Sequence, residues 1–118
     1  MAKDFKRFTV ANCSTSTGAS GSTVYTVPTG TKETVVIGIT LANKSSSGIT
    51  ADVFIDNYTG SNDVYLVKGA SIPVGSSLEV MSGNKVVLQS DGSAGDIIKV
   101  TSSASNALDA VVSVLEDV

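Results

Sequence analysis

The stretch that decides the fold is Thr34-Val35-Val36-Ile37-Gly38-Ile39-Thr40-Leu41-Ala42. Apolar side chains occupy every odd position from Val35 to Leu41, and the even positions are mostly small or polar. A repeat of two residues is typical of a β-strand that buries one face. Val, Ile and Thr branch at Cβ and fit a pleated sheet better than a helix. The stretch therefore predicts a strand with a strong inner face.

The same alternation recurs on both sides of this strand. Residues 49–57 place Ile49, Ala51, Val53 and Ile55 on one face, and residues 108–115 do the same with Leu108, Ala110, Val112 and Val114. Further strands are expected at 5–13, 22–27, 64–67, 78–80, 85–89 and 96–101. Strands that recur about every ten residues are typical of a sandwich or barrel. We predict an all-β fold: a single antiparallel β-sandwich, jelly-roll or Ig-like, of about 8–9 strands.

The length of 118 residues fits one domain overall. We expect residues 1–13 to form an N-terminal arm or first strand, residues 14–22 a flexible Ser/Gly loop, and residues 23–118 the sandwich. The polar segment 43–48 is expected to be a hairpin loop. The expected core residues are Ile37, Ile39, Val53, Ile55, Val112 and Val114.

Composition excludes several classes of function. The net charge of −3 argues against a nucleic-acid binder, which needs a basic face. The chain has no apolar run long enough to span a membrane and no apolar signal segment near its start. It has no His and a single cysteine, Cys13, so Cys–His and Ser–His–Asp chemistry are excluded. We therefore expect no enzyme, no catalytic residue, no cofactor and no metal.

Two groups of carboxylates were candidates for chemistry. The loop from Asp91 to Asp96 could offer oxygen ligands to Ca²⁺, but it lacks the spacing and the bidentate Glu of a calcium loop. Asp52, Asp56 and Asp63 could form a glycosidase-like pair on one outer face. Outward Asp side chains on strands usually serve solubility, so we interpret the first group as a hairpin connection and the second as a solvated surface.

Apolar residues also fall on the faces that should meet water. If the alternation holds, these outward residues are Val36, Phe54, Tyr65, Val67, Ile97, Val111 and Leu115. A monomer has no need of them, so they indicate a second buried surface in a homo-oligomer or a larger lattice.

The two ends of the chain carry opposite charge. Lys3, Lys6 and Arg7 lie near the start, interleaved with Phe5 and Phe8, and the last ten residues hold three carboxylates and no cation. Charged chain ends are most simply solvated; the functional alternative is a basic segment that docks on an acidic neighbour, with the aromatic rings as anchors. The candidate partner-contact residues are Lys3, Phe5, Lys6, Arg7, Phe8, Phe54, Tyr65, Val111 and Leu115.

From about residue 24 to residue 116 the chain resembles small virion structural proteins of tailed bacteriophages. The segments that carry the resemblance are Tyr25-Thr26-Val27-Pro28-Thr29-Gly30, Val35–Asn43, Tyr65–Lys68, Ile72-Pro73-Val74-Gly75, Lys85-Val86-Val87-Leu88, Gly95-Asp96 and Leu108–Glu116. The insertion of residues 90–94 before Gly95-Asp96 departs from the tighter loop of that family.

The resemblance implies a structural role in the virion, most simply as a capsid decoration (cement) protein made in the host cytoplasm. Its partners would be the major capsid protein or other virion proteins. One alternative is a tail, neck or baseplate component. An alternative from another class is a carbohydrate-binding β-sandwich module, but such sites stack sugars on aromatic rings. The chain offers only Tyr25, Tyr58 and Tyr65, and no Trp.

Overall fold

The computed structural model describes residues 3–16, 21–28, 33–57, 63–80, 85–90 and 94–117, with the backbone alone at residues 3, 4 and 117. These residues form nine strands and no helix. The strands are β1 (Lys3–Val10), β2 (Ser22–Thr26), β3 (Glu33–Asn43), β4 (Ile49–Asp56), β5 (Asp63–Ile72), β6 (Ser77–Glu79), β7 (Val86–Gln89), β8 (Ile97–Ser102) and β9 (Leu108–Asp117). Each expected strand is present, so the all-β prediction is confirmed.

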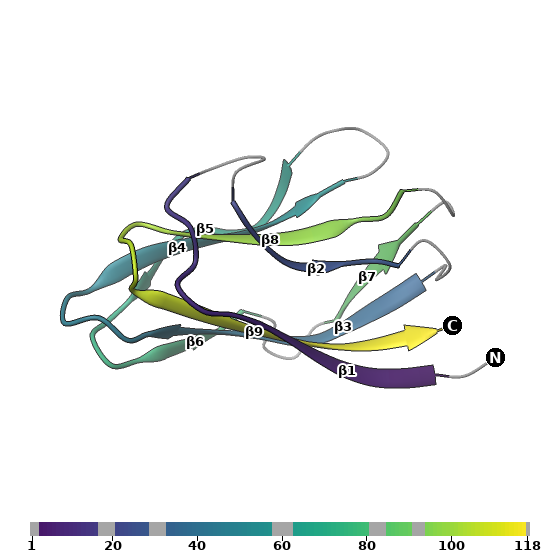
Figure 1. The fold of residues 1–118 in the computed structure, drawn as a ribbon, viewed down its shortest axis with the longest axis horizontal. Helices are drawn as coiled ribbons and strands as arrows, with labels where there is room; N and C mark the ends of the chain where they lie inside the picture. The colour runs from purple at the N-terminus through teal and green to yellow at the C-terminus, as the bar shows by residue number, and fades with distance from the viewer. Residues whose placement is uncertain are drawn as a thin grey trace.

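The strands make two antiparallel sheets that pack face to face (Figure 1). Sheet A has the order β1-β9-β3-β6, and β7 also pairs with β3. Sheet B has the order β2-β8-β4-β5. With β6 and β7 sharing one strand position, this is the order of a jelly roll, in which most connections pass from one sheet to the other. The antiparallel sandwich is confirmed, and the order selects the jelly roll over the Ig-like alternative.

The segment after β3 was expected to close a hairpin, and that expectation is wrong. β3 belongs to sheet A and β4 to sheet B, so residues 44–48 cross between the sheets. The buried Asn43 side chain fixes the crossing: its amide donates to the carbonyl oxygens of Ser47, at 2.8 Å, and of Ile72, at 3.0 Å. Polarity of a loop does not distinguish a hairpin from a crossing between layers.

The core lies between the sheets and is built from Val, Ile and Leu. Four of the six expected core residues, Ile39, Val53, Val112 and Val114, are fully buried, and Ile55 is half-buried at the margin. The residues of the core also include Val36, Leu41, Ile72, Leu88, Ile98, Val100 and Leu108.

The sixth expected core residue, Ile37, is 38% exposed. The pairing of β3 with β9 slips by one residue between Val36, opposite Val114, and Gly38, opposite Ser113. Ile37 is therefore the extra residue of a β-bulge, and the alternation changes phase there. As a result Val36, expected to face outward, is buried, and Val35 turns out to the surface.

The first strand is part of the sheet. β1 pairs with β9 over its whole length, from Lys3 opposite Asp117 to Val10 opposite Ala110, and it forms one edge of sheet A. The expected loop 14–22 lies partly outside the described residues, at 17–20; on either side of that gap the Ser14 amide donates to Ser22 Oγ at 2.8 Å. Both ends of the chain lie at one end of a molecule that measures 45 × 26 × 21 Å (Figure 1).

Candidate interaction surface

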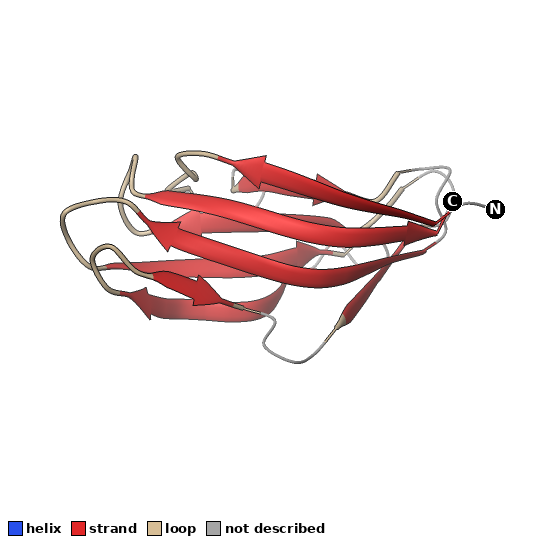
Figure 2. Ribbon diagram, turned by 90° about the horizontal axis from the view of Figure 1, so that it is seen from below, coloured by secondary structure: helices blue, strands red, loops and turns tan. Residues whose placement is uncertain are grey.

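The outer face of sheet A, whose strands are nearest the viewer in Figure 2, carries a row of four apolar side chains that follows from the strand register. Phe5 on β1 is paired with Leu115 on β9, Leu115 with Val35 on β3, and Val35 with Val87 on β7. Successive strands lie about 4.8 Å apart, so neighbouring side chains of the row are in contact range. We call Phe5, Leu115, Val35 and Val87 the apolar row.

The apolar row is open to water. Phe5 is 78% exposed and Val87 55% exposed, while Leu115 and Val35 between them are half-buried. Phe5 and Val87 are two of the five large hydrophobic residues that are exposed in the described part of the chain, and Ile37, in the β3 bulge on the same sheet, is a third. A contiguous apolar patch on a sheet face is a feature of surfaces that bind a partner.

Two polar rows flank the apolar row. On the side toward the chain termini, the strand register aligns Lys3, Asp117, Glu33 and Gln89. On the other side, Arg7 is aligned with Ser113 and Gly38, and Lys85, two residues before Val87, falls on the same face by alternation. Arg7, Glu33 and Lys85 are all exposed. An apolar centre with a charged rim is the usual anatomy of a protein interface.

Two of the candidate contact residues of β1 face inward instead. Phe8 lies opposite Val112, and its ring packs on the buried Tyr25 with centroids 4.8 Å apart. Lys6 lies opposite Val114, and its Nζ is 2.9 Å from Glu116 Oε1. These two side chains attach β1 to the rest of the sandwich and leave only its other face to a partner.

Glu116 is a buried carboxylate that joins the two sheets. Tyr25, on β2 of sheet B, donates its hydroxyl hydrogen bond to Glu116 Oε2 at 2.6 Å, and the same hydroxyl is 2.9 Å from Thr34 Oγ1. Burial acts to raise the pKa of Glu116, but the hydrogen bond from Tyr25 and the contact with Lys6 outweigh it, and the pKa lies below its usual value. Burial, and then the bond to Glu116, raises the pKa of Tyr25. Glu116 therefore stays ionised at neutral pH.

The outer face of sheet B also carries aromatic residues, but they are covered. Phe54 on β4 has none of its surface exposed although it is not part of the core between the sheets. Its ring centroid is 5.1 Å from that of its cross-strand neighbour Tyr65, and Lys68 Nζ lies 4.7 Å over the Tyr65 ring. Lys99, opposite Phe54 on β8, is also buried. Phe54 therefore offers no surface to a partner, and the Tyr65 ring is already in contact with two neighbours.

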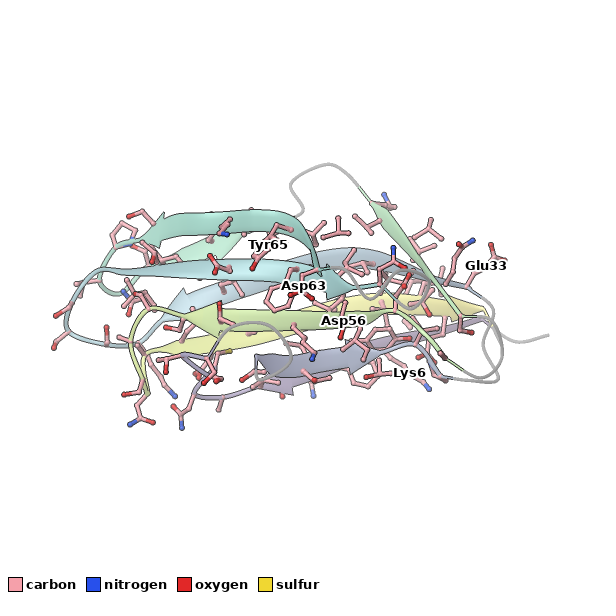
Figure 3. The ribbon with its side chains drawn as sticks, turned by 90° about the horizontal axis from the view of Figure 1, so that it is seen from above. Lys6, Glu33, Asp56, Asp63 and Tyr65 are labelled. Carbon is pink, nitrogen blue, oxygen red and sulfur yellow. The ribbon has the colours of Figure 1, made fainter. Side chains whose placement is uncertain are left out.

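The outward carboxylates of sheet B are tied to neighbouring groups (Figure 3). Asp56 lies opposite Asp63 on β5, and its Oδ2 is 3.6 Å from Lys99 Nζ. Asp52 accepts hydrogen bonds from the Gly69 amide and the Thr101 hydroxyl, at 2.6 and 3.2 Å. Among the described residues no three His, Cys, Asp or Glu side chains gather where they could hold a metal ion; Asp91 lies outside those residues.

Two further features offer little chemistry. An open polar pocket of about 210 Å³ is lined by Thr15, Thr50, Asp52, Thr101, Ser102 and Ser103, without an aromatic ring. The single thiol, Cys13, is buried, and burial raises its pKa to about 11, which leaves it protonated and poorly nucleophilic at neutral pH. Among the described tyrosines, Tyr25 is buried, and Tyr65 is half-buried with Lys68 Nζ over its ring, so neither offers a free ring to stack on a sugar; Tyr58 lies outside the described residues.

The structure sorts the nine candidate contact residues into distinct places. Phe5, Leu115 and Arg7 lie in or beside the apolar row, and the half-buried Val111 lies on the same face, opposite Thr9. Lys3 lies in the terminal polar row by its backbone register. The sequence interpretation missed Val35 and Val87, which complete the row. Val35 was assigned to the inner face because the bulge at Ile37 leaves no mark in the alternation.

Comparison with known proteins gave no match: not with a family model, a curated protein or a solved structure. Along the described part of the chain, no helix is long and apolar enough to cross a membrane.

Proposed function

We propose that this chain is a structural protein of a tailed-bacteriophage particle, a capsid decoration (cement) protein that stabilises the head lattice. The observation that carries the proposal is the exposed apolar row Phe5–Leu115–Val35–Val87 on the outer face of sheet A. The chain would act as a building block of the particle. The apolar row would form the buried centre of a contact with the major capsid protein or another virion protein, or between copies of the chain.

Three features support a role in assembly. The row stands on four strands of a sheet whose inner face is packed against sheet B, so its side chains are held in fixed positions. The residue at its exposed end is a phenylalanine, which contributes a large apolar area to a contact. The sequence segments that resemble phage virion proteins include Lys85-Val86-Val87-Leu88 and Leu108–Glu116, and these two segments supply half of the row.

The head is the preferred location over the tail, neck or baseplate. A small sandwich with one flat face can be repeated at many equivalent positions on a capsid lattice. The acidic net charge of the chain also suits an exposed position, because charge of one sign keeps neighbouring subunits soluble before they bind.

The proposal is tested with particles of a phage from which the gene for this chain has been deleted. Purified chain is mixed with these particles, and heads and tails are then separated by sedimentation. We expect the chain on the heads, and we expect Val87→Ser to reduce the bound fraction about tenfold or more, because a buried apolar contact would be replaced by a hydroxyl. The matched control is Val74→Ser, which alters an equally exposed valine (53%) in the turn between β5 and β6; β6 pairs with residues 40–42 of β3, toward the other end of that strand from Val35.

Three outcomes would contradict the proposal. Chain found only on tails would transfer the function to the tail alternative. Chain found on neither heads nor tails would remove the virion function altogether. Equal loss of binding in Val74→Ser and Val87→Ser would show that the apolar row is not the contact.

A further inference from the structure

We infer that the outer face of sheet A binds the same face of a second copy of this chain, so that the unit that assembles is a two-fold symmetric dimer of stacked sheets. This inference rests on the proposed function, because it names the partner of the same apolar row. The size of the face and the arrangement of its charges both favour a second copy of the chain as the partner.

The size of the face fits a dimer. Sheet A presents four strand positions, and β9 is ten residues long. With strands about 4.8 Å apart and about 3.3 Å per residue, the face covers on the order of 600 Å² in projection. Stable interfaces bury about 800 Å² of accessible surface on each partner, and accessible area exceeds the projected area of a side-chain surface. One sheet face is therefore large enough for a dimer, and two such faces stack at about 10 Å.

The charges are complementary on the β3–β7 side of the face. The row on one side of the apolar row holds the cations Arg7 and Lys85, and the row on the other side holds the exposed carboxylate of Glu33, with Asp117 and Lys3 in the same row by register. A two-fold axis that runs along the apolar row, between two stacked copies, turns one flanking row onto the other. The cationic row of each copy then lies over the row that contains Glu33 in the other copy, and this happens twice by symmetry.

The same rotation places particular pairs close together. The apolar row of one copy lies along the apolar row of the other, so Phe5 packs near Phe5 and Val87 near Val87. Lys85 on β7 then lies over the neighbourhood of Glu33 on β3 of the second copy, one strand spacing to the side. Within a single chain Lys85 and Glu33 stand on opposite sides of the row, so their contact exists only in the dimer.

The free edge of sheet A is a poorer route to the same dimer. Two β1 strands that paired edge to edge in antiparallel register about Arg7 would set Arg7 of one copy opposite Arg7 of the other, and a register about Lys6 would do the same with Lys6. Like charges directly opposite each other across a strand pair are destabilising, and cations on an edge strand are a usual device against such pairing. The charges therefore favour stacking of faces over extension of the sheet.

The test is sedimentation equilibrium of the purified chain over a range of concentrations, with charge-swap variants. We expect a monomer–dimer equilibrium. Lys85→Glu and Glu33→Lys should each weaken the dimer about tenfold or more, and the double variant Lys85→Glu with Glu33→Lys should restore most of the affinity, since it exchanges the charges and keeps their sum. Val74→Ser is again the control and should leave the dissociation constant unchanged.

The outcomes separate this inference from the proposed function. A chain that stays monomeric at the highest concentration reached, or a double variant no better than the single variants, overturns the inference. If that monomer still binds phage heads through Val87, the proposed function stands and its partner is a different protein. If the chain dimerises as expected and never binds heads, the inference stands and the proposed function fails.

Discussion

The two outer faces of the sandwich handle apolar residues in different ways. On sheet B, Phe54 is fully covered within the chain: the Tyr65 ring packs beside it, and Lys68 Nζ lies over the Tyr65 ring. On sheet A, Phe5 stands free at the end of a row that nothing in the described chain covers. An outward apolar residue is therefore not by itself a sign of an interface.

The difference follows from what surrounds each aromatic ring. Sheet B supplies a second ring and the aliphatic stems of two lysines, which can lie on apolar surface while their charges reach water or a carboxylate. Next to Phe5, Lys6 is turned inward to Glu116, and Arg7, on the same face as Phe5, is itself exposed and leaves the ring 78% open to water. Phe54 contributes to the stability of the monomer, whereas Phe5 would contribute mainly to the free energy of binding a partner.

The largest expected effect is on sheet B. Phe54→Ala should lower the free energy of unfolding by about 3–5 kcal/mol, because it leaves a cavity under Tyr65. Urea unfolding followed by circular dichroism measures it, and Phe54→Leu, which keeps most of the volume, should cost clearly less. A loss below about 1 kcal/mol would mean that Phe54 is not covered as described and would erase the contrast between the two faces.

A smaller effect is expected where β1 is attached beneath the apolar row. Glu116→Gln should lower the free energy of unfolding by about 1–3 kcal/mol, because the buried tyrosine loses a charged acceptor. The ion pair with Lys6 adds at most about 1 kcal/mol, since that ammonium is largely exposed. The matched control is Tyr25→Phe, which removes the donor of the same hydrogen bond and leaves Glu116 in place.

Glu116→Gln should also alter how the free energy of unfolding depends on pH. The pKa of Glu116 is lower in the folded protein than in the unfolded chain, so its stabilisation is present above the unfolded pKa and is lost as the pH falls through the folded pKa. Wild-type protein should therefore lose more stability than Glu116→Gln between about pH 6 and about pH 3. Equal losses in the two proteins would contradict the assignment.

The smallest effect on folding is expected at the most exposed ring. Phe5→Ala should change the free energy of unfolding of the monomer by no more than about 0.5 kcal/mol, because the side chain has little contact to lose. Unfolding is measured at a concentration below that at which the chain associates. A loss of 2 kcal/mol or more, as for a core residue, would show that Phe5 is covered within the chain and would remove the apolar row.

The fold was predictable from the sequence because alternation is a local property of each strand. Ile49–Asp56 and Leu108–Asp117 show it plainly, and both were located to within two residues. The order of strands was not predictable, because pairing joins residues far apart, as Phe5 is joined to Leu115. The assignment of the loop after β3 failed for the same reason: whether a turn stays in a sheet depends on where the next strand finds its partner.

The candidate surface was predictable only in part. Val111 and Leu115 were recognised because β9 keeps strict alternation, whereas Phe5 was recognised, together with the inward Phe8, as an aromatic residue among the cations of the first segment. Val35 was missed because a single extra residue at Ile37 inverts the faces of the N-terminal half of β3. Val87 was missed because β7 has only four residues, too few to show a period. Phe54 was assigned to the correct face, but its exposure depends on Tyr65 and Lys68 from another strand.

The pairing of Lys3 with Asp117 places the backbones of these two residues about 5 Å apart, at the end of the sandwich that carries the apolar row. Any tag fused to either end would emerge beside Phe5 and Leu115 and would compete with whatever binds there. A circular permutant avoids this: a short linker joins the old ends, and the chain is opened between Ser46 and Ser47, exposed residues in the crossing at the far end of the molecule. Such a rearranged chain would carry an affinity tag or a fluorophore while leaving the outer face of sheet A unobstructed.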